Sequence, residues 1–183
     1  MGHATESNEE DVVGFLKAQH KQIEALLKEV VATVGADRVE KFRDLCHLLT
    51  IHEAGEEAVV HPVASRALKH GEAMVAARLK EEMAAMTTIA ELKLLDPSSD
   101  AFDVKLRKLQ SSVVAHAGRE ERDELNTLIK NIDRDRLLRM RKAVEMVESR
   151  TDGDAPDDTK ATDPGVYERV TLVNPRDWAA GGP

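Results

Sequence analysis

Two copies of one short pattern carry most of the chemistry that this sequence offers. Residues 52–57 read His-Glu-Ala-Gly-Glu-Glu, and residues 116–121 read His-Ala-Gly-Arg-Glu-Glu. Positions i and i+4 lie on the same face of an α-helix, so each copy directs an imidazole and a carboxylate at the same space. Two such helices facing each other would form a metal site. The mixture of nitrogen and oxygen donors suits iron, manganese or zinc.

Both copies lie on apolar stripes that run through four segments of the chain. The apolar residues of each stripe alternate in steps of three and four, which is typical of helices that face the core of a bundle. Each stripe is interrupted by polar residues where leucine is expected, and a bound metal would offset the cost of burying their charge. The interruptions are His20, then His52 with Glu56, then Glu82, and finally His116 with Glu120.

The four interruptions are predicted to lie at one level of the bundle. Turn signals at residues 34–37, at 61–62 and at 96–100 separate four helices, and short connections make neighbouring helices antiparallel. About 14 residues separate each interruption from the turn at one end of its helix. At about 1.5 Å per residue, all four would lie roughly 20 Å from the same end of the bundle. This agreement favours one shared site.

The predicted fold is all-α, an up-down antiparallel four-helix bundle with an additional C-terminal helix and an extended tail. Aromatic residues make up only 3% of the chain and charged residues 33%, which favours packed helices over sheet. Residues 1–150 are assigned to the bundle and an additional helix over about 134–148, which caps the bundle or pairs with another subunit. Residues 151–183 are assigned to a linker, rich in Asp, Pro, Thr and Gly up to residue 165, and an extended tail.

Composition restricts the class of partner and the compartment. The net charge is −8 and no basic cluster stands out, which argues against nucleic-acid binding. No apolar run approaches 18 residues, so no membrane span is expected. Cys46 is the only cysteine, so no intrachain disulfide is expected and a reducing cytoplasm is the simplest compartment. We expect a monomer or a weak homodimer.

The paired motifs, the lone upstream histidine His20 and the proline Pro62 together resemble the hemerythrin-like HHE cation-binding family over about residues 11–130. The resemblance implies a four-helix bundle that holds a non-haem centre of two iron ions with an oxo or hydroxo bridge. It also implies roles for the motif residues. Those roles are terminal imidazole ligands at His20, His52 and His116, and bridging carboxylates at Glu56 and Glu120. The two ions are expected about 3–4 Å apart.

The third helix departs from the family pattern, which normally has Glu-His there. The matching pair is Glu81-Glu82, so we expect three histidines at the site and predict Glu82 as a ligand. A carboxylate beside a ligand or on a solvated face is the alternative for Glu82. His61 and His70 are interpreted as ordinary loop or surface residues. Four further glutamates are expected on the surface or beside ligands: Glu24, Glu53, Glu57 and Glu121.

The tail contains the only tyrosine, Tyr167, and it offers one further donor. A phenolate stabilises ferric iron, and the linker before Tyr167 is long enough to let the tail fold back over the bundle. We therefore predict Tyr167 as a metal ligand at a position that the missing histidine leaves open. The alternative is that Tyr167 only anchors the tail by packing.

The predicted ligand set favours peroxide chemistry. Carboxylates are hard anionic donors and favour the ferric state, which suits two-electron exchange with hydrogen peroxide better than oxygen carriage. No additional domain in the sequence would report a sensed signal, and no motif for cage formation supports storage. The predicted function is a cytoplasmic di-iron protein that decomposes hydrogen peroxide, catalase-like, in oxidative-stress defence. The alternatives are binding or sensing of oxygen or nitric oxide, iron storage or delivery, and a metal-free helical interaction module.

Overall fold

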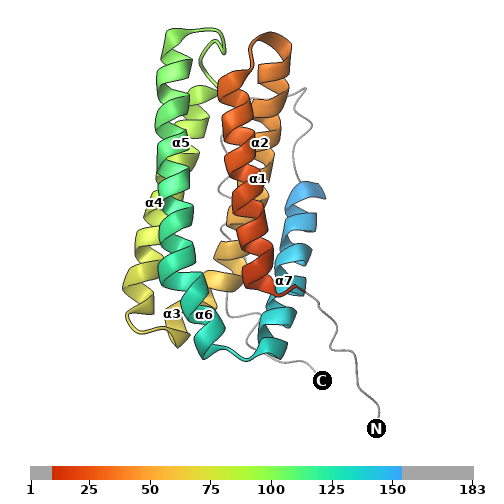
Figure 1. Cartoon of the computed structure of the whole chain (residues 1–183), viewed down its shortest axis with the longest axis vertical. Helices are drawn as coiled ribbons and strands as arrows, with labels where there is room; N and C mark the ends of the chain where they lie inside the picture. The colour runs from red at the N-terminus through yellow and green to blue at the C-terminus, as the bar shows by residue number, and fades with distance from the viewer. Residues whose placement is uncertain (1–9, 154–183) are drawn as a thin grey trace.

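The computed structural model describes residues 10–153, and these residues form the four-helix bundle that the stripes predict (Figure 1). Four helical rods stand side by side and antiparallel, and the described residues contain no strand. Two rods are single helices, α1 (Val12–Ala32) and α4 (Gly71–Leu92). The other two are each an α-helix followed by a π-helical turn and a short α-helix. These are α2 (Gly35–Gly55), η1 (Glu56–Val60) and α3 (His61–Ala67), then α5 (Asp100–Glu120), η2 (Glu121–Leu125) and α6 (Asn126–Asn131).

Local chemistry explains where the rods begin. The Asp11 carboxylate accepts hydrogen bonds of 3.0 Å from the first free N–H groups of α1, and the Ser99 hydroxyl accepts one of 3.2 Å at the start of α5. At the corner between α3 and α4, a Cβ on Gly71 would lie 2.3 Å from the carbonyl oxygen of Ala64. Only glycine permits so close an approach, so this residue allows the chain to reverse direction tightly.

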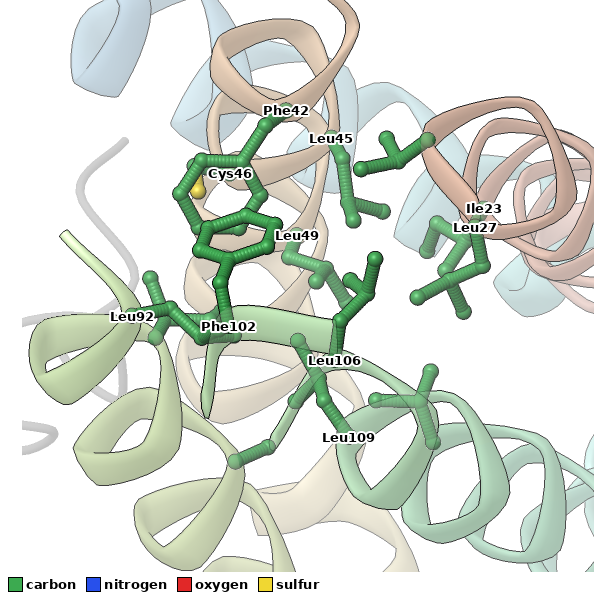
Figure 2. Packing of buried hydrophobic residues seen from close by; sticks show 14 residues of the cluster. Ile23, Leu27, Phe42, Leu45, Cys46, Leu49, Leu92, Phe102, Leu106 and Leu109 are labelled. Carbon is green, nitrogen blue, oxygen red and sulfur yellow. The ribbon is translucent and has the colours of Figure 1, made fainter. Parts of the chain in front are cut away.

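Two apolar clusters fill the interior, one toward each end of the bundle. In the first, Phe42 and Phe102 meet edge to face with ring centroids 5.3 Å apart, and leucines of α1, α2, α4 and α5 belong to the same cluster (Figure 2). The second is built from the starts of α1 and α4, from α3, α6 and α7, and from nearby turns. The predicted polar positions fall between the two clusters in every rod. The site is therefore a polar layer enclosed on two sides by hydrocarbon, where charge is expensive to bury.

The additional helix α7 (Arg134–Gly153) runs beside the bundle and packs against α2 and α1 (Figure 1). Its first half belongs to the second apolar cluster, with Val144 fully buried. The helix is longer than predicted and includes the first three residues of the expected linker. The rest of that linker and the tail, with Tyr167, lie outside the described residues, and so does any contact of the tail with the bundle.

Within residues 10–153, no helix is both long enough and apolar enough to cross a membrane.

Candidate metal centre

A π-helical turn begins within each copy of the repeated motif, at Glu56 in the first and at Glu121 in the second. In the first, the backbone N–H of His61 donates to the carbonyl oxygen of Glu56, five residues earlier. Pro62 follows and has no N–H to donate, which removes one ordinary helical hydrogen bond at this point. A π turn places residues i and i+5 on one face, and such turns are frequent at functional sites. His61 is therefore rotated onto the same face as Glu56.

The three predicted histidines converge on the two predicted bridging carboxylates. His20 Nε2 lies 3.2 Å from Glu120 Oε2 and 3.9 Å from Glu56 Oε1. His52 Nε2 lies 3.4 Å from Glu56 Oε2, and His116 Nε2 lies 3.7 Å from Glu120 Oε2. Glu56 and Glu120 are fully buried. The motifs thus place three imidazoles around one carboxylate pair.

The other ring nitrogen of each histidine is held from outside the layer. The Nδ1 atoms of these three histidines, in chain order, lie 2.9 Å from oxygens of Glu121, Gln19 and Glu81. Carboxylate and amide oxygens only accept hydrogen bonds, so Nδ1 carries the proton and donates it. In a neutral imidazole, Nε2 is then left with a lone pair that faces the carboxylates and can bind a metal ion. This is the arrangement by which proteins orient histidines that bind metal ions.

Many atoms that face the layer are buried without a hydrogen-bond partner among the described residues. Buried polar groups without partners are rare, and a cluster of them needs an explanation. They include His20 Nε2, His116 Nε2, both carboxylate oxygens of Glu56 and Glu120, and one oxygen each of Glu53, Glu82 and Glu124. A shared cation would satisfy these atoms together, so the residues fit a metal centre.

Glu82 lies at the level of the bundle that its distance from the turn predicts, and it contacts a fourth histidine. Its Oε1 lies 3.9 Å from His116 Nε2 and 2.9 Å from His61 Nε2, and His61 Nδ1 lies 3.1 Å from Glu124 Oε1. His61 is only 2% exposed, so its interpretation as a loop or surface residue was wrong, and so was the expectation that only three histidines reach the site. The error arose because His61 is off the 3-4 stripe until the π turn rotates it. His70, by contrast, is exposed.

Two more buried glutamates belong to the layer. Glu124 is fully buried, and the sequence contains a signal for it, because positions 116, 120 and 124 continue one helical stripe in steps of four. Glu53 was expected on the surface or beside a ligand, and it is buried at 7% exposure. Glu24 and Glu57 are only partly covered or exposed.

Burial and neighbouring charges shift the pKa values of the side chains in the polar layer in different directions. Burial, reinforced by the nearby charge of His20, lowers the pKa of His52 to about 3, so this imidazole is neutral and can bind a metal. Burial alone would raise the pKa of Glu120, but the positive charge of His20, whose Nε2 lies 3.2 Å from Glu120 Oε2, lowers it to about 2. Without a metal ion, burial and the repulsion of Glu120 raise the pKa of Glu56, and burial and the repulsion of Glu82 raise that of Glu53.

The donor atoms form overlapping groups rather than one cage. In each group, the donor atoms lie within 4.8 Å of one another. Glu56 belongs to the first and second groups, and Glu120 belongs to the first and third. The groups are His20, His52, Glu56 and Glu120, then Glu56, Glu82 and His116, then His61, Glu120 and Glu124. Shared carboxylates between adjacent groups are what a centre with more than one cation requires.

A cavity of about 210 Å³ reaches the layer between α1, α2 and α5. His20, His52, His116, Glu53 and Glu121 are among its lining residues. Gly118 also lines it, and a Cβ at this position would meet nothing within 4 Å. The cavity is large enough for a small molecule to approach the histidines.

The family model for the hemerythrin HHE cation-binding domain matches residues 11–128, and the chain therefore belongs to this family. No curated protein matches the chain. Among solved structures, it is similar to a hemerythrin HHE cation-binding domain-containing protein from Mycobacterium kansasii, at 20% identity and a TM-score of 0.70. That match covers 79% of this chain and 89% of the other. The chain therefore contains a cation-binding domain with the hemerythrin-like fold, and α7 lies beyond the region that the family model matches.

Proposed function

We propose that this protein holds two iron ions in the polar layer and decomposes hydrogen peroxide to water and dioxygen. The observation that supports the metal centre best is the set of buried donor atoms between the two apolar clusters that have no hydrogen-bond partner in the described part of the chain. His20 and His52 would hold one ion and His116 with Glu82 or His61 the other, while Glu56 and Glu120 would join them. Nitrogen and carboxylate donors suit iron.

Carboxylates still dominate the layer after the fourth histidine is included. Five buried glutamates face four histidines, and hard anionic donors favour ferric iron over ferrous iron. This supports peroxide chemistry over oxygen carriage. The five glutamates are Glu53, Glu56, Glu82, Glu120 and Glu124.

The reaction needs electrons and protons to be exchanged in pairs. One peroxide takes up two electrons and two protons and becomes two water molecules, and a second releases two electrons and two protons and becomes dioxygen. When bound, a pair of iron ions supplies the two-electron exchange. Glu121 accepts a hydrogen bond from His20 and lines the cavity, and Glu53 also lines it, so both would hold and pass protons in this reaction. Glu57 is exposed and does not line this cavity, which makes Glu121 the stronger candidate for proton transfer.

Loading of the metal-free protein with ferrous iron under anaerobic conditions is expected to give about two equivalents per chain. His52→Ala and His116→Ala should each lose a large part of this capacity, because each removes a donor from the layer. His47→Ala, an exposed histidine on α2, serves as the matched control. Full capacity in both layer variants, measured by elemental analysis after desalting, would show that the site is wrongly placed.

The iron-loaded protein is expected to release one dioxygen for every two peroxides consumed, followed with an oxygen electrode. His52→Ala and His116→Ala should fall to the level of free iron, while His47→Ala keeps the activity. If the loaded protein releases no more oxygen than free iron, the peroxide proposal fails even when the metal content is correct.

The cavity offers a test of access to the same site. Because Gly118 faces open space, Gly118→Phe should fold normally and fill part of the cavity beside His116. We expect the KM for peroxide to rise several-fold with unchanged iron content. Val104→Phe, at a 71% exposed position on the same helix, is the control. Equal KM values for both variants would exclude this cavity as the route of entry.

The fourth histidine gives specific support to a second candidate, reversible binding of oxygen or nitric oxide. His61 brings the ligand set closer to a histidine-rich one, which favours the ferrous state more than carboxylates do. A stable oxygen or nitric-oxide adduct of the reduced protein, together with no oxygen release from peroxide, would favour this candidate.

A further inference from the structure

A chain of hydrogen bonds connects α7, which the family model does not cover, to a histidine of the metal centre. His52 Nδ1 lies 2.9 Å from Gln19 Oε1, and Gln19 Nε2 donates to Glu148 Oε1 at 2.8 Å. All three side chains are buried, with exposures of 2%, 6% and 8%. Gln19 and Glu148 lie 129 positions apart in the sequence, so the contact depends on how α7 docks.

A glycine inside the first motif permits that docking. A Cβ on Gly55 would lie 2.8 Å from Val144 Cγ1 and 3.6 Å from Glu148 Cγ, so α7 packs against α2 at the one residue of the motif that has no side chain. Arg141 fastens the same face of α7 to α1, because it donates to the Glu10 carbonyl oxygen at 2.8 Å and stacks over the Phe15 ring. Glu148 is therefore held at a defined place beside the centre.

The chemistry of the three groups determines the direction of the hydrogen bonds. A carboxylate only accepts, so Glu148 requires the amide NH₂ of Gln19 to face it. The Gln19 carbonyl oxygen must then face His52, which places the proton on Nδ1 and leaves the Nε2 lone pair directed toward Glu56. A flipped amide would present NH₂ to Nδ1 and force the proton onto Nε2, where it would block metal binding.

We infer that Glu148 and Gln19 are positioning residues that hold His52 in the tautomer and orientation that bind metal. The inference rests on the metal-binding part of the proposed function and not on the peroxide reaction. It also makes α7 part of the metal centre rather than a helix that only covers the bundle.

The test is a titration of the metal-free protein with cobalt(II), with binding and geometry followed by the visible absorption of the ion. Gln19→Leu and Glu148→Leu are expected to weaken the binding of cobalt in the first group of donors by 10–100-fold, the usual effect of losing a hydrogen-bond partner of a metal ligand. Glu148→Gln should have a smaller effect, because a second amide can accept from Gln19 but no longer dictates its orientation. Glu145→Gln is the matched control, since this glutamate lies on α7 at the surface and pairs with Arg141.

A double-variant cycle separates positioning from simple packing. If Glu148 acts through Gln19, the variant that carries both leucine substitutions should bind cobalt no more weakly than Gln19→Leu alone. Additive losses, or unchanged cobalt affinity in a Glu148→Leu protein with normal helical circular dichroism, would overturn the inference. If the unaltered protein does not bind cobalt, the result would instead count against the proposed metal centre. Failure of the inference about Glu148 and failure of the proposed metal site are therefore distinguishable.

Discussion

Glu56→Leu is expected to raise the stability of the metal-free protein while it abolishes most of the metal capacity. Within residues 10–153, neither carboxylate oxygen of Glu56 has a hydrogen-bond partner, and the group is fully buried beside Glu120. Burial of a polar group without a hydrogen bond costs about 1–3 kcal/mol, and an apolar side chain of similar volume removes that cost. For a domain of this size, each kcal/mol raises Tm by roughly 2–4 °C. The same change removes a carboxylate shared by two groups of donors.

Glu120→Leu is the informative comparison. Both glutamates are proposed metal donors, but in the metal-free protein Glu56 is expected to lower the stability of the fold and Glu120 to raise it. Glu120 forms an ion pair with His20 at 3.2 Å, which lowers its pKa despite burial. Its removal should therefore lower the stability of the metal-free protein, although both variants lose metal. Thermal unfolding in the presence of a chelator measures the first effect, and elemental analysis after iron loading measures the second.

The contributions of the two glutamates to the stability of the metal-free protein are expected to change with pH in opposite directions. Because the pKa of Glu56 is raised, this side chain holds its proton more tightly in the folded protein than in the unfolded chain. Its protonation therefore contributes stability to the folded protein below about pH 4.5, and this contribution is lost as pH rises. The advantage of Glu56→Leu should thus grow between pH 5 and pH 8. The lowered pKa of Glu120 gives stability that is present above pH 4.5 and lost as pH falls toward about 2. Equal stability changes for both variants across this range would contradict the assignment.

His61→Leu is expected to destabilise the metal-free protein by about 3–5 kcal/mol, the usual cost of removing one partner from a buried ion pair. Burial would lower the pKa of His61, but its hydrogen bonds to Glu124 and Glu82 raise it to about 10, so the imidazole is a cation between two buried carboxylates. Leucine would remove the cation that pairs with both carboxylates. The stabilisation should be fully present below pH 6.5 and should be lost as pH rises through about 10.

Two further variants make this result specific. His47→Leu replaces an exposed histidine on α2 and should change stability little. The triple variant His61→Leu, Glu82→Gln, Glu124→Gln should recover much of the loss, since it removes the unpaired charges. If His61 takes the place of the absent third-helix histidine, the single variant should also hold less than two equivalents of iron. Wild-type stability together with full iron content would contradict both roles.

The periodicity of the sequence was sufficient to predict the four rods and the level of the polar layer. An α-helix has a fixed rise and rotation per residue, so positions such as His52 and Glu56 lie on one face whatever surrounds them. The same regularity placed Glu82 in the layer, although the third helix lacks the family's histidine. These features depend only on spacing along one helix and on the position of the turns.

Only the tertiary structure decided which additional groups reach the centre. His61 enters because a π turn adds one residue to the helical turn after Glu56, and a pattern of steps of three and four does not anticipate such an insertion. The Nδ1 partners of the histidines come from other rods, with Glu121 lying 101 positions from His20. Glu148 lies on α7, and it is close to the centre because this helix packs against Gly55 of α2. Such contacts depend on how separate helices pack, and no spacing within one helix contains that information.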